Sequence, residues 1–88
     1  MVELDSAWRL HPQVALRPEP FGALAYHFGT RRLSFLKTPK LVAVVEALGS
    51  GNNVQTAFAS ASVTPEETPA YVAALERLSA GDMIVPAA

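Results

Sequence analysis

The sequence contains no cysteine, few charged residues and no long apolar run. Without cysteine the chain has neither a disulfide framework nor a thiolate metal site. Charged residues make up 17% of the 88 residues and the formal net charge is -1, whereas nucleic-acid-binding domains typically carry a basic excess. The longest apolar run is too short to span a membrane. We therefore expect no membrane and no nucleic acid partner. Because no secretion signal is evident, we expect a cytoplasmic protein.

Residues that could carry catalysis are also scarce. His11 and His27 are too isolated in the sequence to predict a metal pair, and neither has a nearby Ser-Asp or Cys partner. We expect both histidines to be solvated. The stretch "GSGNN", residues 49–53, has glycines but lacks the Lys-Ser/Thr of a phosphate-binding loop. The sequence therefore indicates a protein that is not an enzyme and that uses no cofactor or metal.

The composition that remains is that of a folded domain. Half of the residues are hydrophobic, and a chain of this length has room for one domain. We expect a single domain over residues 1–88, with an ordered core from about residue 7 to residue 85.

The first half of the chain has the alternating pattern of β-strands. Residues Ala23 to Leu36, "ALAYHFGTRRLSFL", alternate on both sides of Gly29-Thr30, and Gln13 to Pro18 form a shorter alternating run. If Gly29-Thr30 is a two-residue loop, His27 pairs with Arg32. This register gathers Leu24, Tyr26, Phe28, Leu33 and Phe35 on one face of the hairpin, and Ala23, Ala25, His27, Arg32 and Ser34 on the other.

The same loop fixes an expected hydrogen-bonding pattern. Phe28 and Arg31 would exchange both backbone hydrogen bonds, and bonded and non-bonded pairs would alternate from there. In that pattern the N–H groups of Arg32 and Ser34 point toward the open edge of the second strand. We also expect Phe35 to be a core residue.

The second half of the chain has helical periodicity. Thr38 is a suitable N-cap before Pro39, and the helix is expected to end at Gly49. A short helix follows Asn53. Thr64 to Glu67 fits a capping box, and the main third helix is expected from about Pro69 to Ala80. With a short strand possible in "MIVP", the fold class is α+β: a winged helix-turn-helix-like domain with a three-stranded antiparallel sheet followed by three helices.

This order of elements carries a family resemblance over nearly the whole chain. The segment Trp8 to Leu48, then Leu36-Lys37-Thr38, Gly51-Asn52-Asn53-Val54 and Ala80-Gly81-Asp82-Met83-Ile84, resembles the PqqD-like family, in its mycofactocin biosynthesis subgroup. Lys37 stands where the wider family usually has Asn. The resemblance implies a peptide chaperone, or recognition element, that binds the leader of a ribosomally made precursor peptide. It also implies delivery of that peptide to a radical S-adenosylmethionine (SAM) maturase, without catalysis by the chaperone itself.

The resemblance and the open hairpin edge predict the same binding site. The second hairpin strand pairs on one side only, so an extended peptide can add to it as a further strand. The family places the peptide between this strand and the third helix. The candidate peptide-binding residues are therefore Arg31, Arg32, Leu33, Ser34, Phe35, Leu36, Tyr71, Val72, Leu75 and Leu78. The alternative for the apolar members of this set is that they belong to the core.

Two further alternatives concern charge and partners. Arg31, Arg32, Lys37 and Lys40 cluster around the strand and could attract an acidic leader, or could simply prevent edge-to-edge aggregation. A winged-helix DNA-binding regulator shares the expected architecture, but "NVQTAFAS" in the second helix has no Arg or Lys. An open edge can also pair with a second copy of the chain, which would give a homodimer.

Overall fold

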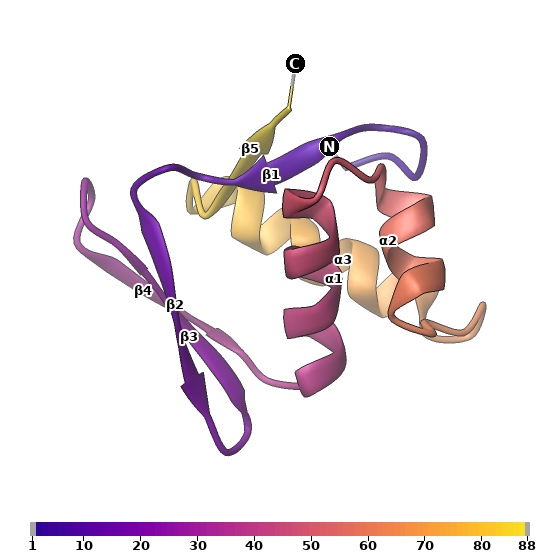
Figure 1. The fold of residues 1–88 in the computed structure, drawn as a ribbon, viewed down its shortest axis with the longest axis horizontal. Helices are drawn as coiled ribbons and strands as arrows, with labels where there is room; N and C mark the ends of the chain where they lie inside the picture. The colour runs from indigo at the N-terminus through magenta and orange to yellow at the C-terminus, as the bar shows by residue number, and fades with distance from the viewer. Residues whose placement is uncertain (1, 88) are drawn as a thin grey trace.

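The structure is a computed structural model, and it describes residues 2–87. Along the described chain the elements are β1 (Trp8–Leu10), β2 (Val14–Glu19), β3 (Gly22–His27), β4 (Arg32–Leu36), α1 (Pro39–Gly49), α2 (Val54–Ser60), α3 (Thr68–Ala80) and β5 (Ile84–Pro86). In Figure 1 the sheet of β2, β3 and β4 lies on one side of α1, and α2 lies on the other. The expected α+β class and three-stranded antiparallel sheet are confirmed, while the winged-helix comparison stays a prediction.

The sheets have a simple order. The three-stranded sheet runs β2-β3-β4, and a second sheet pairs β1 with β5. β4 therefore forms one edge of the larger sheet. The "MIVP" segment does contribute a short strand, but its partner β1, at Trp8–Leu10, was not expected from the sequence.

The predicted hairpin register is confirmed. Ala25 lies opposite Ser34, Tyr26 opposite Leu33, and His27 opposite Arg32. Because side chains alternate along a strand, the two predicted groups of residues do lie on opposite faces of the sheet.

The face that packs on the helices is the one with the small residues. Ala23 and Ala25 are buried, whereas Leu33 and Phe35 are 60% and 59% exposed. The expectation that Phe35 is a core residue is therefore wrong. The physical reason is space: α1 contacts β3, and alanine side chains on β3 allow a helix to lie close to the strand.

His27 is also placed differently from the expectation. It is 2% exposed, on the same inner face as the alanines, and its ring lies 4.3 Å from that of His11 between centroids. Its Nδ1 atom accepts hydrogen bonds from the backbone N–H groups of Gly29 and Thr30, at 3.0 and 3.1 Å. The expectation of a solvated histidine is wrong here, because the side chain holds the hairpin loop together.

Helices α1 and α2 begin at the predicted caps. Thr38 Oγ1 accepts from the N–H of Leu41 at 3.0 Å, and Asn53 Oδ1 accepts from the N–H of Thr56 at 2.8 Å. The apolar stripes that follow these caps meet in one core with residues of β3, β4 and β5. Its largest fully buried members are Leu36, Leu48, Leu75, Met83, Ile84, Val44, Val45 and Val54.

Gly22, the first residue of β3, lies against the last residue of β4. Its φ of 153° is unfavourable for other residues, and a Cβ placed there would lie against the carbonyl oxygen of Leu36. Glycine therefore allows the start of β3 to approach the end of β4 closely. This approach sets the position of Lys37 and Thr38, which lead directly into α1.

Candidate functional site

The free edge of β4 presents backbone groups whose direction can be read from the neighbouring strands. The N–H of Phe28 donates to the carbonyl of Gln13 at 2.8 Å, on the β2 side of β3. Because donors alternate along a strand, His27, Ala25 and Ala23 direct their backbone groups toward β4. Their partners Arg32, Ser34 and Leu36 therefore point inward, and the N–H groups of Leu33 and Phe35 point toward the open edge.

This pattern corrects the expected one. The loop between β3 and β4 is not a two-residue turn, since the N–H of Arg31 donates to the carbonyl of His27 at 2.7 Å and Arg31 has a φ of 62°. The loop comprises residues 28–31, closed by a residue in the left-handed conformation. The pairs from His27–Arg32 to Leu24–Phe35 were predicted correctly, but the predicted Phe28–Arg31 pair is absent and the bonded and non-bonded pairs are exchanged. Ser34 is thus an inward donor and not an edge donor.

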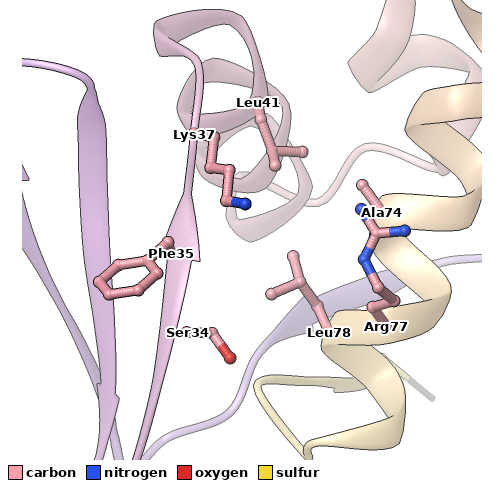
Figure 2. Close-up of a pocket in the computed structure, with 7 residues that line it drawn as sticks. All are labelled: Ser34, Phe35, Lys37, Leu41, Ala74, Arg77 and Leu78. Carbon is pink, nitrogen blue, oxygen red and sulfur yellow. The ribbon is translucent and has the colours of Figure 1, made fainter.

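A groove lies between this edge and α3. It has a volume of about 190 Å³ and is lined by Ser34, Phe35, Lys37, Leu41, Ala74, Arg77 and Leu78. Figure 2 shows Ser34 on β4 and Lys37 directly after the end of β4, with Ala74, Arg77 and Leu78 facing them from α3. A neighbouring hollow continues the groove along α3 to Tyr71 and Thr38. The groove is therefore apolar along its floor and runs beside the free strand edge.

Polar contacts fix the start of α3 against the start of α1. The N–H of Thr64 donates to Glu67 Oε1 at 3.0 Å, and the N–H of Glu67 donates to Thr64 Oγ1 at 3.3 Å. This is the predicted capping box. Lys40 Nζ lies 2.7 Å from Glu67 Oε1, and the Thr38 and Tyr71 hydroxyl oxygens are 3.1 Å apart. These contacts join the two helices at one end of the groove.

The Lys40–Glu67 contact also shifts the acid–base properties of its two members. The hydrogen bond from Lys40, followed by that from the Thr64 N–H, lowers the pKa of the Glu67 carboxyl. The same hydrogen bond raises the pKa of the Lys40 ammonium. Both groups are therefore held in their charged forms at neutral pH.

The basic residues near β4 fall into two groups. Lys40 of the predicted cluster is paired with Glu67. Lys37 and Arg77 line the groove from opposite sides. Among residues 2–87, the ion pairs are Arg17–Glu19 and Lys40–Glu67, so Lys37 and Arg77 are left without a carboxylate partner. Arg31 and Arg32 are exposed at the hairpin end of β4.

The structure brings some of the predicted site residues together and separates others. Ser34 and Leu78 line the groove, and Tyr71 lines its continuation. Leu36 and Leu75 are fully buried in the core, and Val72 packs partly buried against it.

Leu33 and Phe35 occupy the other face of the strand. Phe35 contributes to the groove rim, but in Figure 2 its ring points away from α3. Leu33 is not among the residues that line the groove, and its part in peptide binding stays a prediction.

Four lining residues were not among the predicted peptide-binding residues: Lys37, which was predicted only as part of the basic cluster, and Leu41, Ala74 and Arg77. The signal for two of them is helical spacing. Ala74 follows Tyr71 by three positions and precedes Leu78 by four, which places the three on one face of α3. Arg77 lies beside this face. Leu41 is a buried residue of α1, and its exposed part toward the groove follows only from the arrangement of α1 and β4.

The described residues offer little for metal or membrane chemistry. Over residues 2–87, no three His, Asp or Glu side chains gather where they could hold a metal ion. No helix in this part of the chain is both long and apolar enough to cross a membrane. The Nδ1 atoms of His11 and His27 both accept backbone N–H groups, while the buried Nε2 atom of His27 has no hydrogen-bond partner within residues 2–87.

An open strand edge beside an apolar groove is the arrangement of domains that bind extended peptides by strand addition. The sequence comparisons identify a peptide chaperone. The chain belongs to the peptide chaperone MftB family, whose family model matches residues 7–85. The predicted membership of a peptide-chaperone family is confirmed.

Individual relatives have the same description. The chain is 51% identical to the peptide chaperone MftB of Mycobacterium tuberculosis over 82 residues, which are 93% of this chain and 75% of the relative. It is 50% identical to that of Mycolicibacterium smegmatis, again over 93% of this chain and 80% of the relative. The comparison with solved structures gave no significant match.

Proposed function

We propose that this peptide chaperone binds the leader of a ribosomally made precursor peptide as an added strand on β4. The observation that carries the proposal is the pair of outward N–H groups of Leu33 and Phe35 beside the groove. In strand addition, main-chain hydrogen bonds supply affinity and pockets for alternate side chains supply selectivity. The free edge and the groove are adjacent, so one extended segment can use both.

The groove side chains favour an acidic segment. Lys37 and Arg77 face the groove without a carboxylate partner among residues 2–87. A peptide residue opposite Ser34 directs its side chain to the inner face, between these two cations. Arg31 and Arg32 add positive charge at one end of the strand. We infer that these two arginines increase the rate of association with an acidic leader more than they slow its dissociation.

The partner and pathway follow from the family resemblance. We propose that the chaperone delivers the bound peptide to a radical SAM maturase in mycofactocin biosynthesis, in the cytoplasm, and that the maturase alone is the catalyst. The chaperone then needs no cofactor. DNA binding is the weaker proposal, because α2 (Val54–Ser60) contains neither Arg nor Lys to contact phosphates or base edges.

The test uses proline to remove one outward donor. Proline is tolerated in an edge strand where its missing N–H faces outward, and Arg32, the preceding residue, is already in a strand. We expect Leu33→Pro to fold and to bind a fluorescently labelled synthetic mycofactocin precursor peptide at least about tenfold more weakly than Leu33→Ala. The alanine variant loses the same side chain but keeps the donor, so the difference isolates the hydrogen bond.

Peptide backbone methylation provides an independent measurement. In an added strand, alternate peptide N–H groups face β4, so single N-methyl groups along the precursor peptide should weaken binding at every second position within the docked segment. Equal binding by Leu33→Pro and Leu33→Ala, with no alternation in the methyl series, would contradict strand addition on β4.

Sedimentation velocity, with and without the precursor peptide, tests for a homodimer through the open edge. If a second copy occupies β4 in the free protein, sedimentation velocity should show a dimer that the precursor peptide converts to a one-to-one complex. If the protein sediments as a monomer at all concentrations, the homodimer proposal fails while the peptide proposal stands.

A further inference from the structure

The outer face of the three-stranded sheet, the face turned away from the helices, is unusually apolar for a surface. Phe21, Phe28, Leu33 and Phe35 are exposed on it, and Leu24 and Tyr26 are half-buried. The rings of Phe21 and Phe35 meet edge to face, with centroids 6.0 Å apart. Contiguous exposed apolar groups of this kind mark interaction sites more often than scattered single residues do.

The hydrogen-bond pattern connects this face with the peptide edge. Leu33 and Phe35 are the residues whose backbone groups face outward along the edge, and their side chains lie on the outer face. In an added antiparallel strand, the residues directly opposite them therefore also have their side chains on the outer face. The intervening peptide residue, opposite Ser34, points into the groove. One peptide segment thus contacts both faces of the sheet.

We propose that the outer face is the second half of the peptide site, and that the bound segment carries large apolar side chains at the two positions that flank its groove residue. The proposal rests on the strand addition proposed above. Directly opposed side chains in a hydrogen-bonded pair have Cβ atoms about 5 Å apart, so these two side chains would pack on Leu33 and Phe35. Phe21 extends the same surface, because it shares a shallow hollow with Phe35 and Lys37.

The charges around β4 favour a peptide over a second copy of the chain as the occupant. If two copies of β4 paired antiparallel about Ser34, with Leu33 opposite Phe35, then Arg31 of each copy would lie opposite Lys37 of the other. Like charges directly opposed across a pair of strands are destabilising. An acidic segment with flanking apolar residues avoids this repulsion and covers the same apolar surface.

The experiment compares two phenylalanines of equal exposure on this face. Phe35 is 59% exposed and Phe28 is 60% exposed, but Phe28 belongs to the β3 side of the hairpin, one strand further from the open edge. The variants Phe35→Ser and Phe28→Ser are titrated with the labelled synthetic precursor peptide, and thermal unfolding is recorded for both. We expect Phe35→Ser to weaken peptide binding about tenfold and Phe28→Ser to leave it within about twofold.

The possible outcomes separate this inference from the proposed function. If Leu33→Pro abolishes peptide binding while Phe35→Ser binds like the wild type, strand addition stands and the outer-face site is overturned. If both serine variants weaken binding equally, the effect is general to the hydrophobic face, and the specific site is also overturned. If the wild type does not bind the peptide, the proposed function fails and this inference fails with it.

A second measurement does not depend on substitution. In NMR spectra of the wild-type protein with the unlabelled precursor peptide, we expect intermolecular contacts between peptide apolar side chains and the rings of Phe35 and Phe21. Contacts confined to Leu41, Ala74 and Leu78 would show that the peptide side chains bind on the groove side alone, and would overturn the proposal.

Discussion

The two edges of the three-stranded sheet differ in what they offer to another strand. On β2, the pairing pattern turns the backbone nitrogens of Val14, Leu16 and Pro18 outward. The Val14 N–H already donates to the carbonyl of His11 at 2.9 Å, and proline has no N–H to donate. On β4, the outward nitrogens are those of Leu33 and Phe35, and both have donors. Proline therefore interrupts one edge where a partner would bind, while the other edge remains intact beside the groove.

This difference shows how a small domain can direct binding to one side. Unprotected strand edges promote aggregation, and proteins commonly block them with proline or charge. Here the β2 edge has Pro18 together with the Arg17–Glu19 ion pair, whose atoms lie 3.2 Å apart. The β4 edge has charge only near its ends, at Arg31, Arg32 and Lys37. We therefore expect a ligand with the opposite charge to approach that edge more readily than a second copy of the chain.

The largest effect is expected from a proline placed at a position of β4 whose backbone N–H faces β3. Ser34→Pro removes a donor that faces β3, so we expect the free energy of unfolding to fall by more than about 2 kcal/mol. Urea unfolding compared with Leu33→Pro, one position away, measures this. If the two variants are equally stable, the assignment of inward and outward donors along β4 is wrong.

A smaller effect, on the rate of peptide association, is expected from reversing a charge at the β4 edge and not at the β2 edge. Arg77→Glu places an anion in the groove beside β4, and Arg17→Glu makes the same charge change at the β2 edge. We expect Arg77→Glu to slow association with the labelled precursor peptide roughly tenfold at low salt and to flatten its salt dependence. Stopped-flow mixing measures both rates. Equal slowing by the two variants would indicate that net charge, and not the groove, controls association.

The smallest change tests whether Pro18 protects the β2 edge. Pro18→Ala restores an outward donor there, and we expect the free energy of unfolding to fall by about 0.4–1 kcal/mol because the unfolded chain becomes less restricted. We also expect weak self-association of the variant, visible by sedimentation velocity at high concentration. A variant that stays monomeric over the same range as the wild type would show that Pro18 is not the feature that blocks this edge.

The strand pairs could be predicted from the sequence because their information is local. Alternation around Gly29-Thr30 allows one register that separates large from small side chains, and the structure has that register. The bonding pattern could not be predicted in the same way. It depends on a four-residue loop that is held by the buried ring of His27 and by the carbonyl of Gln13, a residue in another part of the chain.

The candidate site also combines features that the sequence predicts with features that it does not. The N-caps at Thr38 and Asn53 and the reciprocal hydrogen bonds between Thr64 and Glu67 follow from short motifs, and each is present. Which face of the hairpin packs on the helices depends on how closely α1 approaches β3, and the large side chains therefore lie outside although their hydrophobicity suggests a core. The position of Arg77 opposite Lys37 depends on where α3 lies relative to the end of β4, across the groove, which no local pattern encodes.

The two unpaired cations of the groove have a practical consequence for the choice of assay buffer. Lys37 and Arg77 line one small volume without an anion from the described chain, so a multivalent buffer anion can act as their counterion. Phosphate or sulfate would then compete with the peptide for the groove, beyond the general effect of ionic strength. Affinities measured in phosphate would understate the strength of the complex, whereas chloride solutions of the same ionic strength would come closer to its intrinsic value.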